Sequence, residues 1–593
     1  SFQKCSNIVL ETPPRHFRTS LWMIELSQWN VDDNPLSIQE VNNRHDRNFE
    51  LHHQIGMMQY DEITPNGTPR SLDAYFEEAY ASASRIFPWR YWIMMISFGI
   101  ANSSDASEIL SLSYILSNDQ FRDSILQQES SSWKAGMLAS AIFLGMLLGG
   151  IMAGAIGDNS FVGRRPILLV GLSVNAIAGI LSALTQTLEQ LTFLRCLAGW
   201  GIGATVPPLF TLVTELAPPS KRGMFITVCA SFWMMGSIFV ALTALLVFGN
   251  GPWHYSSWRI FAILCTIPSI LGTAMVNAFV PESPRFLAIH HRHDKALRTA
   301  NQVALKLEFS GTLYSITELQ HYYPPIHSSD DDPSTSMSWR GSYLGCLVSG
   351  ICGFFNSASL LYQPSLRQTT LPLTTIWFSL NFGTYGILTW INSIFVEVHL
   401  EDVYFNSLLF AAANLPGNLV AAFFMDRVGR TLMLMSSSLA ASASLLLFAY
   451  FSKGPSHDSL NAAGIVTSAC LFQAFSITAW NTIDCMTSER FPTSVRSTGM
   501  GICAASGRIG AMIAQFVNGM LLDSPVRLLT VASASLFLAA ITPFMLPQVD
   551  YTHGDLEDTV QTDVIVTAEE RARLQCTDTR KDDTSHSSTR EEC

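Results

Sequence analysis

The sequence Asp426-Arg-Val-Gly-Arg430 stands between two long apolar segments, and a partial copy of it lies about 270 residues earlier. The copy reads Gly154-Ala-Ile-Gly-Asp158 and, four residues further on, Gly163-Arg-Arg165, and it also joins two apolar segments. Each motif therefore supplies a short charged hinge between helices long enough to cross a membrane. A repeat of this kind predicts a transporter built from two related halves.

The composition is that of a membrane protein. The chain has 593 residues, of which 48% are hydrophobic and only 14% charged, whereas soluble domains carry roughly 25% charged residues. The mean hydropathy is +0.25, and the apolar residues gather in blocks of about 20, the length that crosses a hydrocarbon core ~30 Å thick. We therefore predict an all-α, multi-pass protein of the lipid bilayer.

Twelve membrane-spanning helices are predicted, six in each half. They cover residues 89–116, 134–157, 166–187, 191–214, 224–248 and 258–280, then 371–395, 403–425, 431–451, 462–485, 498–522 and 528–546. The expected domains are an N-terminal tail (1–87), a six-helix bundle (88–280), a central linker with short helices (281–365), a second six-helix bundle (366–546) and a C-terminal tail (547–593). One short helix is expected at 73–84, in an N-terminal tail of otherwise low order, and an amphipathic helix is expected at 294–307, in the central linker.

Lysine and arginine concentrate in the hinges and the linker, and the positive-inside rule places these segments and both termini in the cytosol. The apolar stretch 341–361 is rich in Gly, Ser and Asn. We place it at the membrane interface or against the cytosolic face, because a further span would put the second set of arginines outside. The membrane is the plasma membrane or that of an intracellular vesicle. The chain starts at Ser1 without an initiator Met, so a preceding segment can be missing.

A second pair of repeats follows the fourth and tenth spans: Glu215-Leu-Ala-Pro-Pro-Ser-Lys-Arg222 and Glu489-Arg-Phe-Pro-Thr-Ser-Val-Arg496. An acid at one helix end and a guanidinium at the next helix start can form a bidentate pair. We predict that such pairs latch the cytosolic helix ends while the protein faces outward; the alternative is that these charges only fix the topology. The predicted latch residues are Asp158, Arg164, Arg165, Glu215, Arg222, Asp426, Arg427, Arg430, Glu489 and Arg496.

Taken with the run Arg195–Gly203 and with Pro281-Glu-Ser-Pro-Arg285, these motifs resemble the major facilitator superfamily over residues 87–546. The resemblance implies two pseudo-symmetric six-helix bundles around a central solute site. Asp105-Ala-Ser-Glu108, Leu366-Arg-Gln-Thr-Thr370 and the run 376–386 are similar to the synaptic vesicle glycoprotein 2 branch, beside the sugar and organic ion porters. Asn159 stands where the family usually has Arg, and the sugar porters' seventh-helix signature is absent.

The first span carries two carboxylates, Asp105 and Glu108, which lie three residues apart and so on one helical face. Ionisable groups at membrane depth usually face a cavity or a relay. Two adjacent carboxylates oppose each other's ionisation, so we predict a group that exchanges a proton near neutral pH or binds a cationic ligand. The alternative is that the span ends near Ile100 and leaves both acids in an external loop.

Arg508, in the eleventh span, can pair with a carboxylate of the first helix, hold an anionic solute, or form a structural pair. Asp484 either joins the same polar core or only supports Glu489. Trp377, Tyr385, Trp390 and Trp480 can line a cavity and stack on a flat or cationic ligand. Packing is the alternative for these aromatic residues. The glycines 199, 201 and 203 are expected to let helices approach closely.

No enzyme, metal or cofactor pattern is found in the sequence. There is no phosphate-binding loop for ATP, the cysteines form no CxxC pair, and His290-His291-Arg-His293 lacks partners spaced for a metal. The absence of a basic patch with interleaved aromatics argues against nucleic acid. We predict a secondary active transporter that moves a small polar or charged organic solute by alternating access, with a proton as coupling ion. The alternatives are a non-transporting receptor or trafficking protein of vesicle membranes, whose tails bind cytosolic partners, and a facilitative sugar transporter.

Overall fold

The computed structural model describes residues 69–82, 88–126, 132–157, 162–249, 257–324, 361–454, 459–491 and 496–547, together with Ser359. All regular elements within these ranges are helices. The stretch 341–361, apart from Ser359 and Leu361, and the expected C-terminal tail beyond Pro547 lie outside them.

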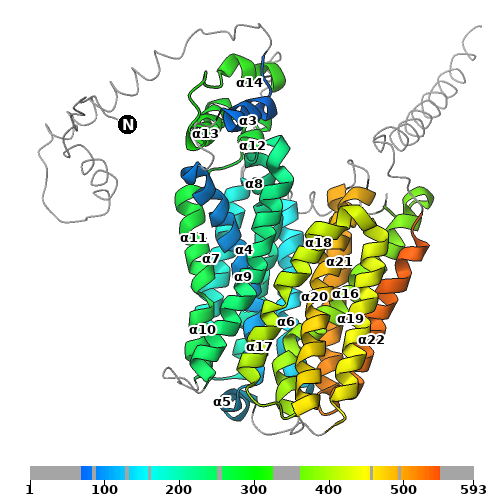
Figure 1. Cartoon of the computed structure of the whole chain (residues 1–593). Helices are drawn as coiled ribbons and strands as arrows, with labels where there is room; N and C mark the ends of the chain where they lie inside the picture. The colour runs from blue at the N-terminus through cyan, green and yellow to red at the C-terminus, as the bar shows by residue number, and fades with distance from the viewer. Residues whose placement is uncertain are drawn as a thin grey trace, which may run out of the picture. The chain divides into compact units, whose positions relative to one another are not determined.

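The helices of the first half begin and end within a few residues of the predicted spans (Figure 1). They are α4 (Trp89–Leu116), α6 (Ser132–Gly157), α7 (Arg164–Ser182), α8 (Leu188–Leu216), α9 (Arg222–Phe248), α10 (Trp258–Cys265) and α11 (Ile267–Phe279). The last predicted span is broken at Thr266, because Pro268 has no N–H to continue the helical hydrogen bonds. Short turns, α5 (Asp119–Phe121), the π-helix η1 (Arg122–Leu126) and the 3-10 helix η2 (Pro219–Lys221), join them.

The second half is also a series of long helices, one of whose predicted spans is broken. Its helices are α16 (Pro364–Glu397), α17 (Val403–Ala412), α18 (Asn414–Val428), α19 (Arg430–Phe451), α20 (Ser459–Arg490), α21 (Arg496–Leu521), α22 (Pro525–Ile541) and the 3-10 helix η4 (Thr542–Met545). The predicted span 403–425 is interrupted at Ala413, and Pro416 near the start of α18 again explains the break.

Ten of the described helical segments are long and apolar enough to cross a membrane. The two remaining long helices, α4 with 28 residues and α16 with 34, are not among these ten, and each comes first in its half. Every residue of α4 from Ala101 to Leu116 is buried, so its polar side chains face protein and not lipid. The helix therefore does not end near Ile100, and the alternative that put both acids in a loop is wrong. The count of twelve spans stays a prediction.

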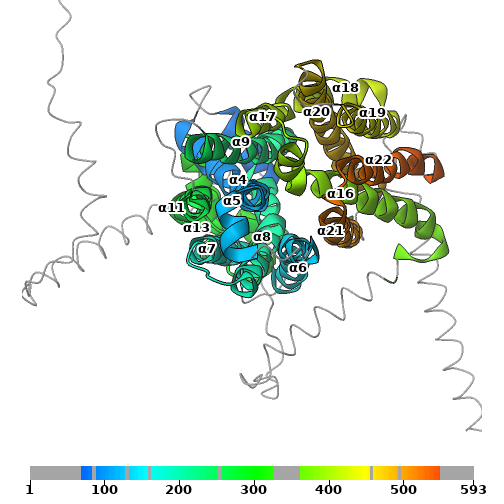
Figure 2. The ribbon, with the colours of Figure 1, turned by 90° about the horizontal axis from the view of Figure 1, so that it is seen from below.

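Each half packs as a bundle of its own. In the first, α8 contacts α6 and α7, and α9 contacts α4; in the second, α19 contacts α20 and α22, and α16 contacts α21. The main helix pairs that join the bundles are α6 with α21, α4 with α16, and α9 with α17, and α9 also touches α18 (Figure 2).

A cap of short helices packs on the first bundle, at the top of Figure 1: α3 (Leu72–Ala81), α12 (Pro284–Ile289), α13 (His293–Lys306) and α14 (Ile316–Tyr322). The hydroxyl of Tyr75 in α3 donates to Asn301 Oδ1 of α13 at 2.8 Å, and the rings of Tyr75 and Tyr314 lie 5.0 Å apart. Both short helices expected from the sequence are present. The end of the bundles that holds Arg164 and Arg430 is called the hinge end below, and the opposite end the far end.

Candidate functional site

Glu108 points into the first bundle, where it forms an ion pair with Arg195 of α8. Arg195 Nη1 lies 2.7 Å from Glu108 Oε1, and the two side chains are 1% and 2% exposed. The same nitrogen also donates to Ser111 Oγ at 3.2 Å. Gly179 of α7 leaves room for this pair, since a Cβ there would come 3.2 Å from Glu108 Oε2. A buried, hydrogen-bonded pair of this kind fastens α4 to α8.

The two carboxylates of α4 therefore do not share one site as the sequence predicted. Sequence reasoning also missed Arg195 as the partner of Glu108. The sequence does indicate that Arg195 has a partner, because it is a charged residue inside the predicted span 191–214, and such residues usually pair with an opposite charge.

The Asp105 side chain does not join the Glu108–Arg195 pair, and it has no comparable partner among the described residues. Its side chain is 3% exposed, and its Oδ1 accepts only a long hydrogen bond of 3.4 Å from Ser104 Oγ. Its Oδ2 is buried with no hydrogen-bond partner among the described residues. The charged group that acts on it is Arg508 of the second bundle. Asp105 thus lies where the two bundles meet.

Arg508, on α21, lies in the field of carboxylates from both bundles. It interacts electrostatically with Asp105 of α4 and with Asp484 of α20. Its guanidinium carbon is 5.6 Å from the ring centroid of Tyr385, within the range of a cation–π contact. Arg508 forms no ion pair within 4 Å in the part of the chain that is described. Asp484 itself is exposed and lies near the hinge end of α20.

Three of the predicted aromatic residues form one group, which contacts Arg508 through Tyr385. Trp480 is central, with ring centroids 5.6 Å from Trp377 and 5.8 Å from Tyr385, both edge-on. Its indole nitrogen donates to Thr384 at 3.1 Å, and that of Trp377 donates to Thr487 at 3.0 Å.

The ring centroids of Tyr385 and of Phe143 in the first bundle lie 5.3 Å apart, so the aromatic group extends across the contact between the two bundles. Trp390 does not belong to it. That side chain is 1% exposed and donates to Gln515 at 2.9 Å, which makes it a packing residue.

The site combines aromatic faces, one guanidinium and two carboxylates. Tyr385, Trp480 and Arg508 are each only partly buried, so a solute can reach them. The aromatic rings can stack on a flat or ring-shaped solute, and Arg508 can bind a polar or anionic group. Asp105 can carry a proton, because its unpartnered oxygen is costly to ionise away from water.

The hinge arginines are paired, but differently from the prediction. Arg164 at the start of α7 forms an ion pair with Glu215 at the end of α8. In the second half, Arg430 Nε donates to both carboxylate oxygens of Glu489, at 3.2 and 3.1 Å. Both pairs join helices of the same bundle. They fasten neighbouring helices and do not tie one half to the other.

The predicted pairing of Glu215 with Arg222 is wrong. Arg222 forms an ion pair with Asp73 of α3, and its Nε donates to Thr214 O at 3.0 Å. Among the remaining latch candidates, Arg165 donates to Asn277, and Arg427 is exposed. Asp158 and the side chains of Asp426 and Arg496 lie outside the described part of the structure.

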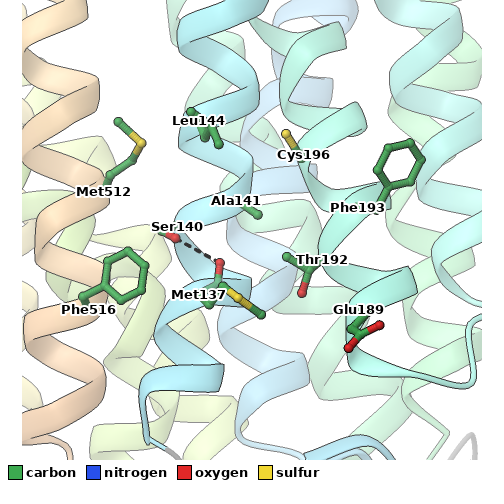
Figure 3. A pocket seen from close by; sticks show the side chains of 10 residues that line it. All are labelled: Met137, Ser140, Ala141, Leu144, Glu189, Thr192, Phe193, Cys196, Met512 and Phe516. Atoms are coloured by element: carbon green, nitrogen blue, oxygen red, sulfur yellow. Dashed lines mark hydrogen bonds between the residues drawn. The ribbon is translucent and has the colours of Figure 1, made fainter.

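A hollow of about 500 Å³ lies between α6, α8 and α21, away from the charged site (Figure 3). Its walls are largely apolar, with Met512 and Phe516 facing Leu144 and Phe193 across it. Leu144 and Phe193 are among the exposed hydrophobic residues, so the hollow opens toward lipid. It is separate from the candidate solute site.

Two related helix bundles that meet at buried charges and aromatic rings from both halves define a secondary transporter of the major facilitator superfamily. The family model described as "Sugar (and other) transporter" matches residues 102–555, and the chain belongs to this family.

Among curated relatives, the chain is 24% identical to synaptic vesicle glycoprotein 2B of Mus musculus, over 77% of this chain and 83% of the relative. It is also 24% identical to synaptic vesicle glycoprotein 2A of Homo sapiens, over 77% of each protein.

The fold is similar to two solved transporters. The xylose transporter XylE from E. coli, in a partially occluded inward open conformation, aligns with a TM-score of 0.57 at 15% identity, over 77% of this chain and all of that one. A D-xylose-proton symporter aligns with a TM-score of 0.55 at 17% identity, over 77% and 98% of the two chains.

Proposed function

We propose that this transporter couples the movement of a small polar or charged organic solute to that of a proton. The observation that carries the proposal is that Asp105 Oδ2 is buried at the contact between the bundles, has no hydrogen bond in the described structure, and lies in the electrostatic field of Arg508 of the other bundle. One solved transporter of similar fold is a proton:xylose symporter, which is in keeping with the proposal.

Asp105 is the proposed proton carrier and Arg508 the group that senses its charge. When Asp105 is ionised, Arg508 balances it across the contact. When Asp105 takes up a proton, that balance is lost and Arg508 is available to a polar or anionic group of the solute. Solute and proton then occupy the site together, which is the coupling that a symporter needs. Trp480 and Tyr385 supply the stacking surface.

The proposed orientation puts the hinge end in the cytosol, as the positive-inside rule predicts. Side-chain contacts between the bundles then gather on the external side. Asn392 of α16 donates to Ser113 of α4 at 2.9 Å, and the rings of Phe248 and Tyr404 lie 5.4 Å apart. Asp484, nearer the hinge end, is exposed. The arrangement supports an inward-facing state in an alternating-access cycle.

The test is uptake into proteoliposomes with an imposed pH gradient, screened over sugars, organic acids and organic cations. The unmodified protein is expected to accumulate one class of solute only when the gradient is present. Asp105→Asn is expected to abolish accumulation but to retain exchange of labelled for unlabelled solute, because exchange requires no net proton movement. Glu108→Met combined with Arg195→Met, which removes a buried pair inside one bundle without leaving an unpaired charge, serves as the control on the same helix. Accumulation that ignores the gradient, or that survives Asp105→Asn, contradicts the coupling.

A further inference from the structure

A second cavity lies at the hinge end of the first bundle, between the start of α7, the link from α11 to α12, and α13. It has a volume of about 400 Å³. Four cationic side chains line it, Arg165, Arg292, Lys295 and Arg298, and a single carboxylate, Glu282. Four positive charges less one negative charge leave an excess of three. Neither the solute site nor the hinge ion pairs use this cavity.

The carboxylate is already engaged by the backbone. Glu282 Oε1 accepts from the backbone N–H groups of Arg164 at 3.2 Å and Ser283 at 3.0 Å, and Oε2 accepts from that of Arg165 at 3.2 Å. Glu282 therefore satisfies the N-terminus of α7, where a negative charge is favoured. The negative charge of Glu282 therefore interacts mainly with the N–H groups at the start of α7. The four cations determine the electrostatic potential in the rest of the cavity.

The positions of three of these cations favour the binding of an anion, because one is anchored and two are exposed. The Arg165 guanidinium is anchored to Asn277, at 2.8 Å from its backbone oxygen and 3.0 Å from its side-chain oxygen. Its Nε is buried with no hydrogen-bond partner in the described structure. Lys295 and Arg298 lie three residues apart on α13, hence on one face. Both are exposed, and neither forms an ion pair with any described residue.

The cavity also lies at the level where membrane helices end. α7 begins at Arg164 and α11 ends at Phe279, which is 41% exposed. Ile289, at the end of α12, is 58% exposed. Exposed apolar side chains next to a basic cavity are typical of a site at the surface of a bilayer with anionic lipids.

We propose that this cavity binds the phosphate groups of a polyphosphorylated inositol headgroup. Arginine binds phosphate in a bidentate manner, and lysine adds a point charge. A headgroup bound there contacts the start of α7 and α13 together, and so fastens the cap to the first bundle.

The test measures binding to the purified full-length protein in detergent by microscale thermophoresis. The probes are dioctanoyl phosphatidylinositol 4,5-bisphosphate, dioctanoyl phosphatidylserine and soluble inositol 1,4,5-trisphosphate. Lys295→Gln combined with Arg298→Gln is expected to weaken bisphosphate binding about 30-fold, from about 1 kcal/mol per cation. Arg122→Gln combined with Lys453→Gln removes two exposed charges at the far end and is expected to change binding less than about twofold.

Equal loss in the two double variants, or equal binding of phosphatidylserine and the bisphosphate, overturns the proposal. Arg298→Lys, which retains the charge, is expected to keep most of the binding, and its failure to do so while the protein stays folded also counts against it. Binding of inositol trisphosphate as tight as that of the lipid, with the same dependence on Lys295 and Arg298, supports the site and identifies a soluble source. Weaker binding of the trisphosphate identifies the membrane as the source. Transport activity enters none of these readouts.

Discussion

At the scale of single residues, Asp105 and Glu108 have different environments although only one turn of α4 separates them. Glu108 forms an ion pair with Arg195 inside one bundle, whereas Asp105 has no ion pair in the described structure and is influenced only electrostatically by Arg508 of the other bundle. A charge that is paired within a rigid bundle does not change during a rocking motion. A charge that lies in the field of the other half changes its environment in every cycle, which is why Asp105 and not Glu108 is the proposed coupling residue.

Glu108→Gln is predicted to destabilise the protein, because it leaves the buried Arg195 without a counter-charge. Breaking a buried pair costs about 3–5 kcal/mol, whereas removing both charges costs much less. The melting temperature in detergent is therefore expected to fall for Glu108→Gln and to recover largely when Glu108→Met is combined with Arg195→Met. Asp105→Asn is expected to leave it unchanged or raise it. Equal melting temperatures for the Glu108 and Asp105 variants would contradict this assignment.

Trp480→Ala is predicted to raise the KM of the transported solute about fivefold, from the loss of about 1 kcal/mol of aromatic contact. Trp480→Phe keeps the ring but loses the hydrogen bond to Thr384, and a smaller rise is expected. Trp390→Phe is the control, because it removes a buried hydrogen bond to Gln515 outside the site. The KM values are measured from the kinetics of uptake. A KM that changes with Trp390→Phe and not with Trp480→Ala would show that the solute does not bind at Trp480.

Residue by residue, the sequence predicted which side chains lie close together better than it predicted which of them form ion pairs. Trp377, Tyr385, Trp480 and Arg508 do lie together, because polar and aromatic residues in buried spans converge where the halves meet. The partner of an ion pair depends on which helices are lateral neighbours, and spacing along the chain does not contain that information. This is why Glu215 was assigned to a residue seven positions on and not to Arg164 of the preceding hinge.

At the scale of helices, α6 and α8 approach each other through interlocking glycines. A Cβ on Gly199 would overlap the carbonyl oxygen of Ile142, and a Cβ on Gly145 would overlap that of Cys196. Gly203 faces α6 in the same way, whereas Gly201 faces Gly171 of α7. The close approach expected from the glycine run is therefore confirmed, and it involves both neighbours of α8.

Gly199→Ala is predicted to destabilise the first bundle by about 1–3 kcal/mol, the usual cost of overpacking. The added methyl group meets backbone, which cannot move aside as a side chain can. Gly154→Ala is the matched control on α6, because no atom lies within 4 Å of a Cβ there. That change is expected to be neutral or to stabilise by up to about 1 kcal/mol. Thermal unfolding in detergent measures both, and equal shifts would contradict the packing argument.

The cap depends on α3, whose Asp73 forms ion pairs with both Arg222 and Arg285. Asp73→Asn is predicted to loosen α3 from the first bundle, because both guanidinium groups lose their counter-charge. Hydrogen–deuterium exchange of residues 72–81 is expected to speed up, with little change in the membrane helices. Glu78→Gln on the same helix removes only an exposed pair with Arg70, which contributes little. Comparable acceleration by both variants would argue against a specific clasp.

The breaks in two predicted spans show what hydropathy alone misses. Residues 258–280 and 403–425 were each expected to form one helix, because the apolar run is continuous. The structure divides both, at Thr266 and Ala413, close to Pro268 and Pro416. The prolines were visible in the sequence, but a proline in a membrane helix can produce a kink or a break, and tertiary packing decides which.

At the scale of the whole transporter, the two halves resemble each other in sequence pattern. The contacts between them, however, are unevenly distributed along the length of the helices. Between-bundle hydrogen bonds and ring contacts gather at the far end and near the middle, where Ser113, Phe143 and Phe248 each have a partner in the second half. The hinge-end pairs Arg164–Glu215 and Arg430–Glu489 stay within their own bundles. A transition to the opposite state therefore has to break the far-end contacts and leaves these hinge pairs intact.

Locking the far end is predicted to stop transport while leaving the hinge end accessible. In a background without native cysteines, Ser113→Cys with Asn392→Cys replaces a pair whose polar atoms lie 2.9 Å apart across the two bundles. Oxidation is expected to join these cysteines and abolish uptake, because alternating access requires the far end to open. Asp484→Cys, added to the same protein, is expected to remain reactive toward an impermeant maleimide applied from the hinge side.

Ser442→Cys with Ser533→Cys is the matched control for this lock, since its hydroxyl oxygens also lie 2.9 Å apart but both helices, α19 and α22, belong to the second bundle. A crosslink within one rigid bundle is expected to leave most of the uptake intact. If both crosslinks stop uptake equally, internal rearrangement of a bundle, and not rocking between bundles, drives the cycle. If the far-end crosslink leaves uptake unchanged, the contact between Ser113 and Asn392 is no gate.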